Sequence, residues 1–431
     1  MIATVRRRNE LGLIFLGAIV TGSAYTLASL GRTASIPADI GPFLGIVLGL
    51  LAVAHVATRR LARTADAVLL PVAGLLNGLG YVFIARLDED LAALQATWTA
   101  VGVAAFVGTL VVIRNTRILE RYRYTLMLVG VALLLMPLVP GVGREIRGAR
   151  IWVSLGSVNF QPGEFAKIVL AVFFASYLVE NREMLRVHTA RLGPVYLPDL
   201  RTLGPVVLAW AASLVVMTAE RDLGTSLLFF ALFVVMLWVA TGRTSYLAVG
   251  GLLFAGGSWL AWTFFDHVQT RVTVWLNPWT DVADTGFQIV QATFALAWGG
   301  IAGTGIGLGN PDRIPIAPTD FIFAAIGEEL GLLGSTAILV AFLLMVGSGL
   351  RIAIRAESPF DKLLAAGLTT IIGLQSFIII GGVIRLVPLT GITLPFVSYG
   401  GSSLVANYVL LALLLRISAS EPAAVPAEVA A

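Results

Sequence analysis

The chain has 431 residues, of which 58% are hydrophobic and only 13% charged. Charged residues make up about a quarter of a typical soluble protein, so this composition excludes a soluble globular chain and indicates an integral membrane protein. The absence of cysteine excludes disulfides, thiolate zinc sites and cysteine nucleophiles. The net charge of +4 comes from arginines and only two lysines, and in a membrane protein it reports topology before nucleic-acid binding.

Apolar runs of about 16–23 residues can cross the ~30 Å hydrocarbon layer as helices. Twelve such runs follow one another: 11–30, 39–57, 67–85, 93–113, 125–140, 164–179, 203–219, 223–240, 245–264, 331–350, 363–384 and 402–416. The first run follows three arginines but lacks a clear cleavage site, so we expect a retained helix rather than a signal peptide. The predicted fold is an all-α polytopic membrane protein of about twelve transmembrane helices.

The positive charges give the orientation. With a cytoplasmic N-terminus, 19 cationic residues fall inside and nine outside, which follows the positive-inside rule and makes both termini cytoplasmic. We divide the chain into N-terminal transmembrane helices (1–120), a core (121–416) and a disordered, alanine- and proline-rich cytoplasmic tail (417–431).

Three outer segments depart from a simple pattern of spans and loops. Segment 141–163 is rich in arginine, and 265–320 is by far the longest connection. Within it, 287–300 is too short to span the membrane and too apolar for open water, which predicts a re-entrant or interfacial helix. Segment 385–401 is apolar but broken by prolines and glycines, a pattern that often marks a binding cavity.

Glu164 and Lys167 begin the sixth run. At a spacing of three they share a helix face and can form an ion pair. The positive end of the helix dipole favours Glu164 and disfavours Lys167. A self-neutralising structural pair therefore competes with a cation held for an anionic ligand, and we favour the second because charges within spans are usually functional.

Asp281 follows Asn277-Pro278-Trp279-Thr280, a rigid aromatic segment that we place at the membrane surface. It is either a general base or an ordinary loop carboxylate, and the residues alone weight the two equally. Asp222 directly precedes a span and is predicted to be a helix N-cap.

Asp320, Glu328 and Glu329 stand at the start of 321–350, which as one helix would run about 45 Å. We expect them near the outer interface, as solvated charges or as cavity lining. Ser398 and Ser402 form either a turn and helix start or a backbone nest for a phosphate. Arginine forks match phosphate oxygens, and six arginines fall outside: Arg144, Arg147, Arg150, Arg271, Arg313 and Arg385. Together they predict an anionic, lipid-linked ligand.

The ordered motifs of 145–415 resemble the SEDS family of cell-wall polymerases, RodA, FtsW and SpoVE. The matching pieces are Gly148-Ala149-Arg150-Ile151-Trp152, Phe160 to Lys167, Asp222-Leu223-Gly224-Thr225, Asn277 to Asp281 with Gly286-Phe287-Gln288, Thr319 to Phe323 with Gly327 to Gly331, and Leu394 to Ser403. Ile151, Gly163 and Pro318 depart from the common pattern. The short tail favours the RodA branch, and 1–120 suggests two spans beyond the family's usual ten.

This resemblance implies a peptidoglycan glycosyltransferase that polymerises lipid II at the outer leaflet. The family's catalytic aspartate falls on Asp281, which would act as general base in an inverting displacement. The residues that we expect to contact substrate are Gln161, Glu164, Lys167, Arg147, Arg150, Arg271, Asp320, Ser398 and Ser402. Lys167, nearby arginines or a divalent cation (magnesium or manganese) are the alternatives for stabilising the leaving group; no protein metal site is predicted.

Two other functions remain open: a lipid II flippase, or a non-catalytic scaffold of the elongation machinery. Neither lysine has a serine three residues before it or Thr-Gly after it, so the serine transpeptidase motifs are absent. The resemblance therefore implies a separate class B penicillin-binding protein as cross-linking partner, alongside other elongation or division proteins, and no nucleic acid.

Overall fold

The computed structural model describes residues 2–36, 40–146, 148–156, 158–186, 190–192, 195–197, 207–208, 211–212, 214–216 and 218–420. Its α-helices are α1 (Ile2–Thr33), α2 (Ile40–Leu61), α3 (Leu69–Leu87), α4 (Glu89–Val112), α5 (Arg117–Arg121), α6 (Arg123–Leu135), α7 (Gly163–Glu180), α8 (Arg182–Arg186), α10 (Leu223–Thr241), α11 (Ser245–Phe264), α12 (Asp266–Leu276), α13 (Phe287–Gly299), α14 (Ile322–Arg355), α15 (Pro359–Val383) and α16 (Gly401–Ala419). Short 3-10 turns are η1 (Met136–Leu138), η2 (Pro278–Asp281) and η3 (Pro311–Arg313).

Nine helices of the described chain are long and apolar enough to cross a membrane: α1 to α4, α10, α11, α14, α15 and α16. They coincide with nine of the twelve predicted runs. The fifth and sixth runs form the shorter α6 and the more charged α7, and the seventh, 203–219, lies mostly outside the described residues. The chain is therefore a multi-pass helical membrane protein, and the number twelve stays a prediction.

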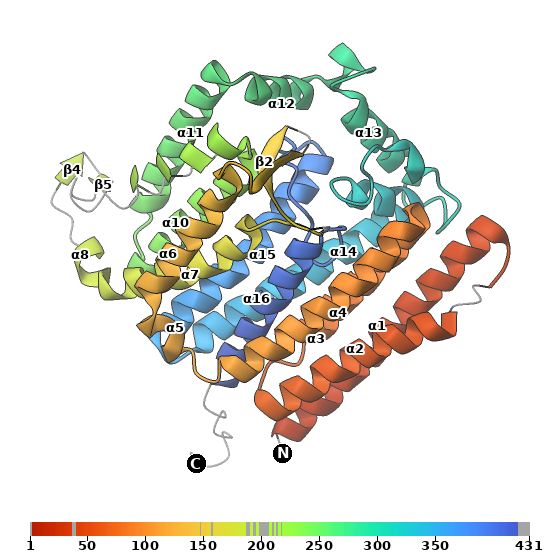
Figure 1. Cartoon of the computed structure of the whole chain (residues 1–431), viewed down its shortest axis with the longest axis horizontal. Helices are drawn as coiled ribbons and strands as arrows, with labels where there is room; N and C mark the ends of the chain where they lie inside the picture. The colour runs from red at the N-terminus through yellow and green to blue at the C-terminus, as the bar shows by residue number, and fades with distance from the viewer. Residues whose placement is uncertain are drawn as a thin grey trace.

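The centre of the bundle is α16. In its most apolar window 89% of the residues are buried, against 17% for α11 at the periphery. Figure 1 shows α16 between α4 and α15, with the α1–α2 pair along one edge and α11, α12 and α13 across the opposite end. Helix α16 is central because it contributes an almost unbroken run of buried apolar side chains to the main core.

Arg416 joins three helix ends at one face of the bundle. Its guanidinium donates to the carbonyls of Leu61, at the end of α2, and Leu110, near the end of α4. Nearby, the Thr64 hydroxyl donates to the Ala419 carbonyl over 2.9 Å. At the same ends of α1 and α2, buried Glu10 contacts both His55 and Arg59. The two ends of the described chain thus lie on one face, and α16 continues past residue 417, where the tail was predicted to begin; residues 421–431 lie outside the described chain.

The prediction of one continuous helix over 321–350 is wrong, because Gly331 interrupts α14 with φ 65° and ψ −163°. Few residues other than glycine adopt this backbone conformation. The amide of Leu332 donates to the Gly300 carbonyl, so the end of α13 crosses α14 at the break. The first turns of α14 therefore form a separate short helix that packs against α13.

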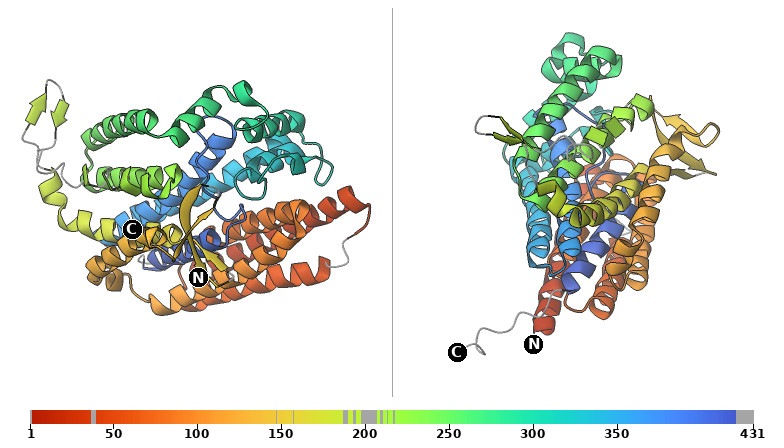
Figure 2. Two further views of the ribbon diagram at one scale, coloured as in Figure 1. Left: turned by 45° about the horizontal axis from the view of Figure 1, so that its top comes forward. Right: turned by 90° about the vertical axis from the view of Figure 1, so that its left-hand side faces the viewer.

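The arginine-rich segment 141–163 is a small antiparallel sheet rather than a loop, a departure from the all-α prediction. Its strands are β1 (Gly143–Ile146), β2 (Ala149–Leu155) and β3 (Val158–Phe160), in the order β1-β2-β3. A second hairpin pairs β4 (Ala190–Leu192) with β5 (Val195–Leu197). Figure 2 shows the first sheet and α12 standing clear of the helices, away from the N-terminus. In β2 the aliphatic residues Ile151, Val153 and Leu155 recur at every second position, a period that is typical of a strand.

Candidate functional site

Asp281 ends η2, in the connection between α12 and α13, and its side chain is exposed. Asn277 caps the turn, since its side-chain oxygen accepts from the Trp279 amide. Trp279 packs edge-on against Phe294 of α13, with ring centroids 5.7 Å apart. The apolar helix predicted at 287–300 is α13, so the aromatic platform and the apolar helix together fix the position of Asp281.

Thr285 holds the Asp281 carboxylate. Its amide and hydroxyl both donate to Oδ2 of Asp281, over 3.1 and 2.9 Å. These hydrogen bonds stabilise the charged form and lower the pKa of Asp281 below its usual value. The backbone amide of Asp284 contributes to the same lowering of the pKa. Asp281 is thus an oriented, ionised carboxylate that is exposed to solvent, as a general base requires.

Two arginines fasten α12 to segment 385–390. Arg271 of α12 donates to the carbonyls of Leu389 and Thr390, over 3.0 and 2.8 Å. In the other direction, Arg385 donates to the carbonyls of Trp275 and Leu276 at the end of α12. Burial lowers the pKa of the Arg271 guanidinium, and the carboxylates of Asp222 and Asp320 oppose that shift. The turn that carries Asp281 is therefore positioned from residues more than 100 positions away in sequence.

An apolar cavity of about 610 Å³ lies beneath α12. Helices α10, α11 and α15 and segment 386–390 complete its walls, and Arg271 is its one charged lining residue. Beside Arg271, the buried hydroxyl of Thr390 has no hydrogen-bond partner in the described structure. The cavity offers room for a hydrocarbon chain, and Arg271 and Thr390 add a cation and a hydroxyl to its lining.

Lys167 is only 2% exposed and is engaged by two partners. Its ammonium lies 2.6 Å from Glu164 Oε2 and 2.8 Å from the side-chain oxygen of Gln375 on α15. The predicted i,i+3 pair therefore exists. An ammonium has three hydrogens, so one remains for another acceptor, and the substrate-binding role of the pair stays a prediction.

Ser398, Ser402 and Gln161 join loops at the same end of the bundle. Ser398 donates to the Thr319 carbonyl and accepts from the Leu394 amide. The Ser402 hydroxyl accepts a hydrogen bond from the backbone amide of Gln161 over 3.0 Å. The two serines are buried with backbone partners, and Asp320 is half-buried. These contacts bring the predicted residues together, and their binding of substrate stays a prediction.

Three predicted residues remain: Arg150, Arg147 and Asp222. Arg150, on β2, is half-buried, and its guanidinium has no hydrogen bond or ion pair with any other described residue. It is available to an anion. Arg147 lies outside the described residues. Asp222 is the predicted N-cap of α10, confirmed by the hydrogen bond from the Thr225 amide.

Glu329 is 1% exposed and forms an ion pair with Arg86 of α3. The same guanidinium reaches Asp312 over 3.1 Å and the Gly309 carbonyl over 2.9 Å. Glu328, also buried, accepts from the Asn310 amide. The two glutamates are therefore neither solvated nor free cavity lining, because they anchor segment 300–313 to the bundle.

The sequence did not lead us to expect roles for Thr285 or Gln375, or the positioning role of Arg385. The contact of Thr285 could have been predicted, since a threonine four residues after a loop aspartate can hydrogen-bond to that aspartate. Nothing in the sequence indicates that Gln375 meets Lys167 or that Arg385 meets the end of α12. In the part of the chain that the structure describes, no three His, Asp or Glu side chains come together as a metal site.

Comparisons with known proteins agree with this architecture. The family model described as "cell cycle protein", which covers FtsW, RodA and SpoVE, matches residues 68–422. The chain belongs to the FtsW/RodA/SpoVE family. Its match begins at residue 68, so α1 and α2 lie outside the family model.

Among curated relatives, the peptidoglycan glycosyltransferase RodA of Mycobacterium tuberculosis is 46% identical over 424 residues, covering 96% of this chain and 90% of the relative. A probable peptidoglycan glycosyltransferase FtsW of Geobacter sulfurreducens is 36% identical over 69% of this chain and 78% of its own. The higher identity and coverage on the RodA side agree with the branch expected from the sequence.

Two solved structures are similar. One, titled as the structural coordination of polymerization and crosslinking by a peptidoglycan synthase complex, contains a chain 27% identical, with a TM-score of 0.67, covering 82% of this chain and 97% of that one. The rod shape determining protein RodA of Thermus thermophilus is 26% identical, with a TM-score of 0.59, covering 83% and 98%.

Proposed function

We propose that this chain is a peptidoglycan glycosyltransferase that polymerises lipid II into glycan strands at the outer face of the bacterial cytoplasmic membrane. The observation that carries the proposal is the exposed, ionised carboxylate of Asp281, in the turn that follows α12, the helix that covers a 610 Å³ apolar cavity. The family membership and the names of the curated relatives support the activity.

Asp281 acts as general base. Its carboxylate takes the proton from the 4-hydroxyl of the acceptor sugar as the hydroxyl oxygen attacks the anomeric carbon of the donor. The bond to the lipid diphosphate breaks, and the electron pair leaves with the phosphate oxygen. One displacement inverts an α-linked donor to a β-linked polymer, without a covalent sugar–enzyme intermediate.

The apolar cavity takes the first part of the lipid chain, and the charged groups near it receive the diphosphate. Arg150 has no partner for its guanidinium among the described residues, and Arg271 keeps donors beyond those used for Leu389 and Thr390. Both match the charge that develops on the leaving group. Magnesium or manganese stays a prediction; with no three-residue metal site among the described residues, such an ion would bind mainly through the diphosphate oxygens.

The test is polymerisation of lipid II by the purified protein in detergent, followed by gel separation of glycan chains. Asp281→Asn removes the base at nearly constant volume, and loss of general-base help typically lowers the rate about 10²–10⁴-fold. Asp284→Asn, three residues away in the same exposed turn, is the matched control and should polymerise at the normal rate. Near-normal polymer from Asp281→Asn would exclude Asp281 as the base.

Orientation is proposed from the arginine distribution, with both termini cytoplasmic and Asp281 outside. Because the native chain has no cysteine, single cysteines can be labelled without background. A cysteine at position 283 should react with a membrane-impermeant maleimide from outside. Reaction from the cytoplasm alone would refute the orientation and the mechanism with it.

We propose a class B penicillin-binding protein as partner, since the sequence has no transpeptidase motifs. The structural similarity to a chain of a peptidoglycan synthase complex supports this. Its contact would steady the turn that carries Asp281. Polymer yield should therefore rise when the two proteins are co-purified; full activity alone, with no co-purification, would refute an activating complex.

A further inference from the structure

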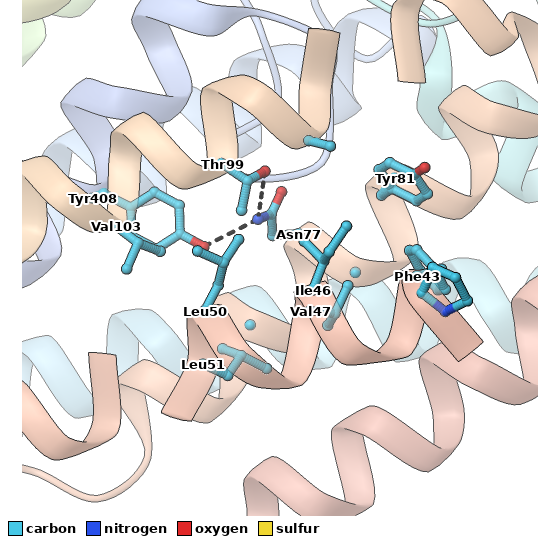
Figure 3. Close-up of a pocket in the computed structure, with 14 residues that line it drawn as sticks. Phe43, Ile46, Val47, Leu50, Leu51, Asn77, Tyr81, Thr99, Val103 and Tyr408 are labelled. Atoms are coloured by element: carbon cyan, nitrogen blue, oxygen red, sulfur yellow. Dashed lines mark hydrogen bonds between the residues drawn. The ribbon is translucent and has the colours of Figure 1, made fainter. Parts of the chain in front are cut away.

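A second cavity lies between α2 and the family core, apart from the site of Asp281. Fourteen residues line its volume of about 160 Å³ (Figure 3). One wall comes from α2, which precedes the family match, and the others come from α3, α4 and α16. None of the lining residues carries a charge. The cavity therefore excludes an ionic ligand, since an unpaired buried charge is costly.

Asn77 of α3 places an unsatisfied polar atom in this wall. The residue is 6% exposed, and its amide nitrogen donates to Thr99 Oγ1 and to the Tyr408 hydroxyl, over 3.2 and 3.0 Å. Both amide hydrogens are then used, as the dashed lines in Figure 3 show. Its oxygen, Oδ1, is buried and has no partner among the described residues. A buried acceptor without a donor calls for an explanation by a ligand or a water.

Tyr408 supplies a hydrogen-bond donor beside the acceptor of Asn77. Its hydroxyl oxygen accepts from Asn77, and within the described chain its own hydrogen has no acceptor. Thr99 is not available, because it donates to the Gln95 carbonyl over 2.8 Å. Among the described residues, one acceptor and one donor on adjacent side chains of this wall are thus left without partners. A hydroxyl group, which both donates and accepts, satisfies the two together.

The mouth and the size of the cavity indicate what carries that hydroxyl. Ile46 lines the cavity and is 55% exposed on the membrane-facing side of α2, so the cavity opens towards lipid. At another edge Phe43 is enclosed between the rings of Tyr25 and Tyr81, with centroids 4.4 and 4.8 Å away. The volume resembles an engineered cavity of about 150 Å³ that holds benzene. It therefore encloses roughly six carbon atoms of a longer molecule.

We propose that this cavity binds a neutral lipid alcohol: a hydrocarbon chain that enters between α2 and α4 with its hydroxyl first. The hydroxyl donates to Asn77 Oδ1 and accepts from Tyr408, and the chain emerges past Ile46 into the membrane. The site does not depend on the glycosyltransferase activity, because none of its residues belongs to the cavity beneath α12.

The experiment uses the full-length protein in lipid nanodiscs and a photoreactive probe. The probe is a 1-hexadecanol with a diazirine within its first six carbons, and its methyl ether is the comparison compound. After irradiation, labelled peptides are identified by mass spectrometry. We expect the alcohol to label the α2 and α4 residues of the cavity about fivefold more than the ether, the value of one net hydrogen bond.

Two variants and a control locate the label. Ile46→Trp fills the mouth and should abolish cavity labelling, whereas Val53→Trp, at an equally exposed position of α2 outside the cavity, should not. Asn77→Leu should make alcohol and ether label equally. Equal labelling by both compounds in the unsubstituted protein would mean that water satisfies Asn77, and undiminished label in Ile46→Trp would mean contact with bulk lipid only. Either result overturns the proposal.

Discussion

Lys167 and Glu164 allow a quantitative test of whether their ion pair is structural. Both are buried, at 2% and 6% exposure, and their charged atoms are 2.6 Å apart. Glu164→Gln leaves the ammonium buried with neutral acceptors, and Lys167→Met leaves the carboxylate without its cation. Removing one partner of a buried pair costs about 3–5 kcal/mol, whereas replacing both is often close to neutral. The double variant should therefore recover much of the free energy of unfolding lost in each single variant.

The assay is reversible unfolding in mixed micelles by added dodecyl sulfate, followed by tryptophan fluorescence. Lys362→Met is the control, because the only other lysine is exposed and its loss should change stability by less than about 0.5 kcal/mol. Polymerisation per folded molecule is then measured. A stable but inactive double variant would assign Lys167 to the substrate, and an active one would make the pair purely structural. Additive losses of stability would refute the coupling itself.

Three further changes test the site and its support. Thr285→Val removes a donor from the charged form of Asp281, so the pKa of Asp281 should rise and the acidic limb of the kcat/KM profile should move to higher pH; an unmoved limb would exclude this hydrogen bond as a determinant. Arg385→Met frees the end of α12 and should lower kcat about 10- to 100-fold by misplacing Asp281, with Arg385→Lys restoring part of it and the melting temperature unchanged. Gly331→Ala requires a left-handed backbone at the crossing and should cost at least about 1–2 kcal/mol of stability, read from the same unfolding assay.

Contacts made within one helical turn could be predicted from the sequence. The Asp222 cap and the Lys167–Glu164 pair depend only on a spacing of three residues. Hydropathy similarly located the nine long helices and α13. The support of Asp281 could not be predicted in this way, because Arg385 and Trp275 meet across 110 positions. Both cavities lie between helices from separate parts of the chain. The period of the apolar residues indicates which face of a helix is buried, but it does not indicate which helix packs there or whether a cavity remains between the two.

The crossing of α13 and α14 at Gly331 makes two parts of the molecule unequal in their attachment to the bundle. The amides of Thr304 and Gly305 donate to the carbonyls of Glu328 and Glu329, and a side chain at Gly303 would collide with that backbone. Segment 300–305 is thus held to α14 by backbone–backbone hydrogen bonds, so we do not expect it to move as a flexible loop. Helix α11 is mostly exposed, and α12, which follows it, is attached to segment 385–390 through arginine side chains. A long lipid-linked polymer must move on after each addition, and we expect α11 and α12 to supply the movement for that step.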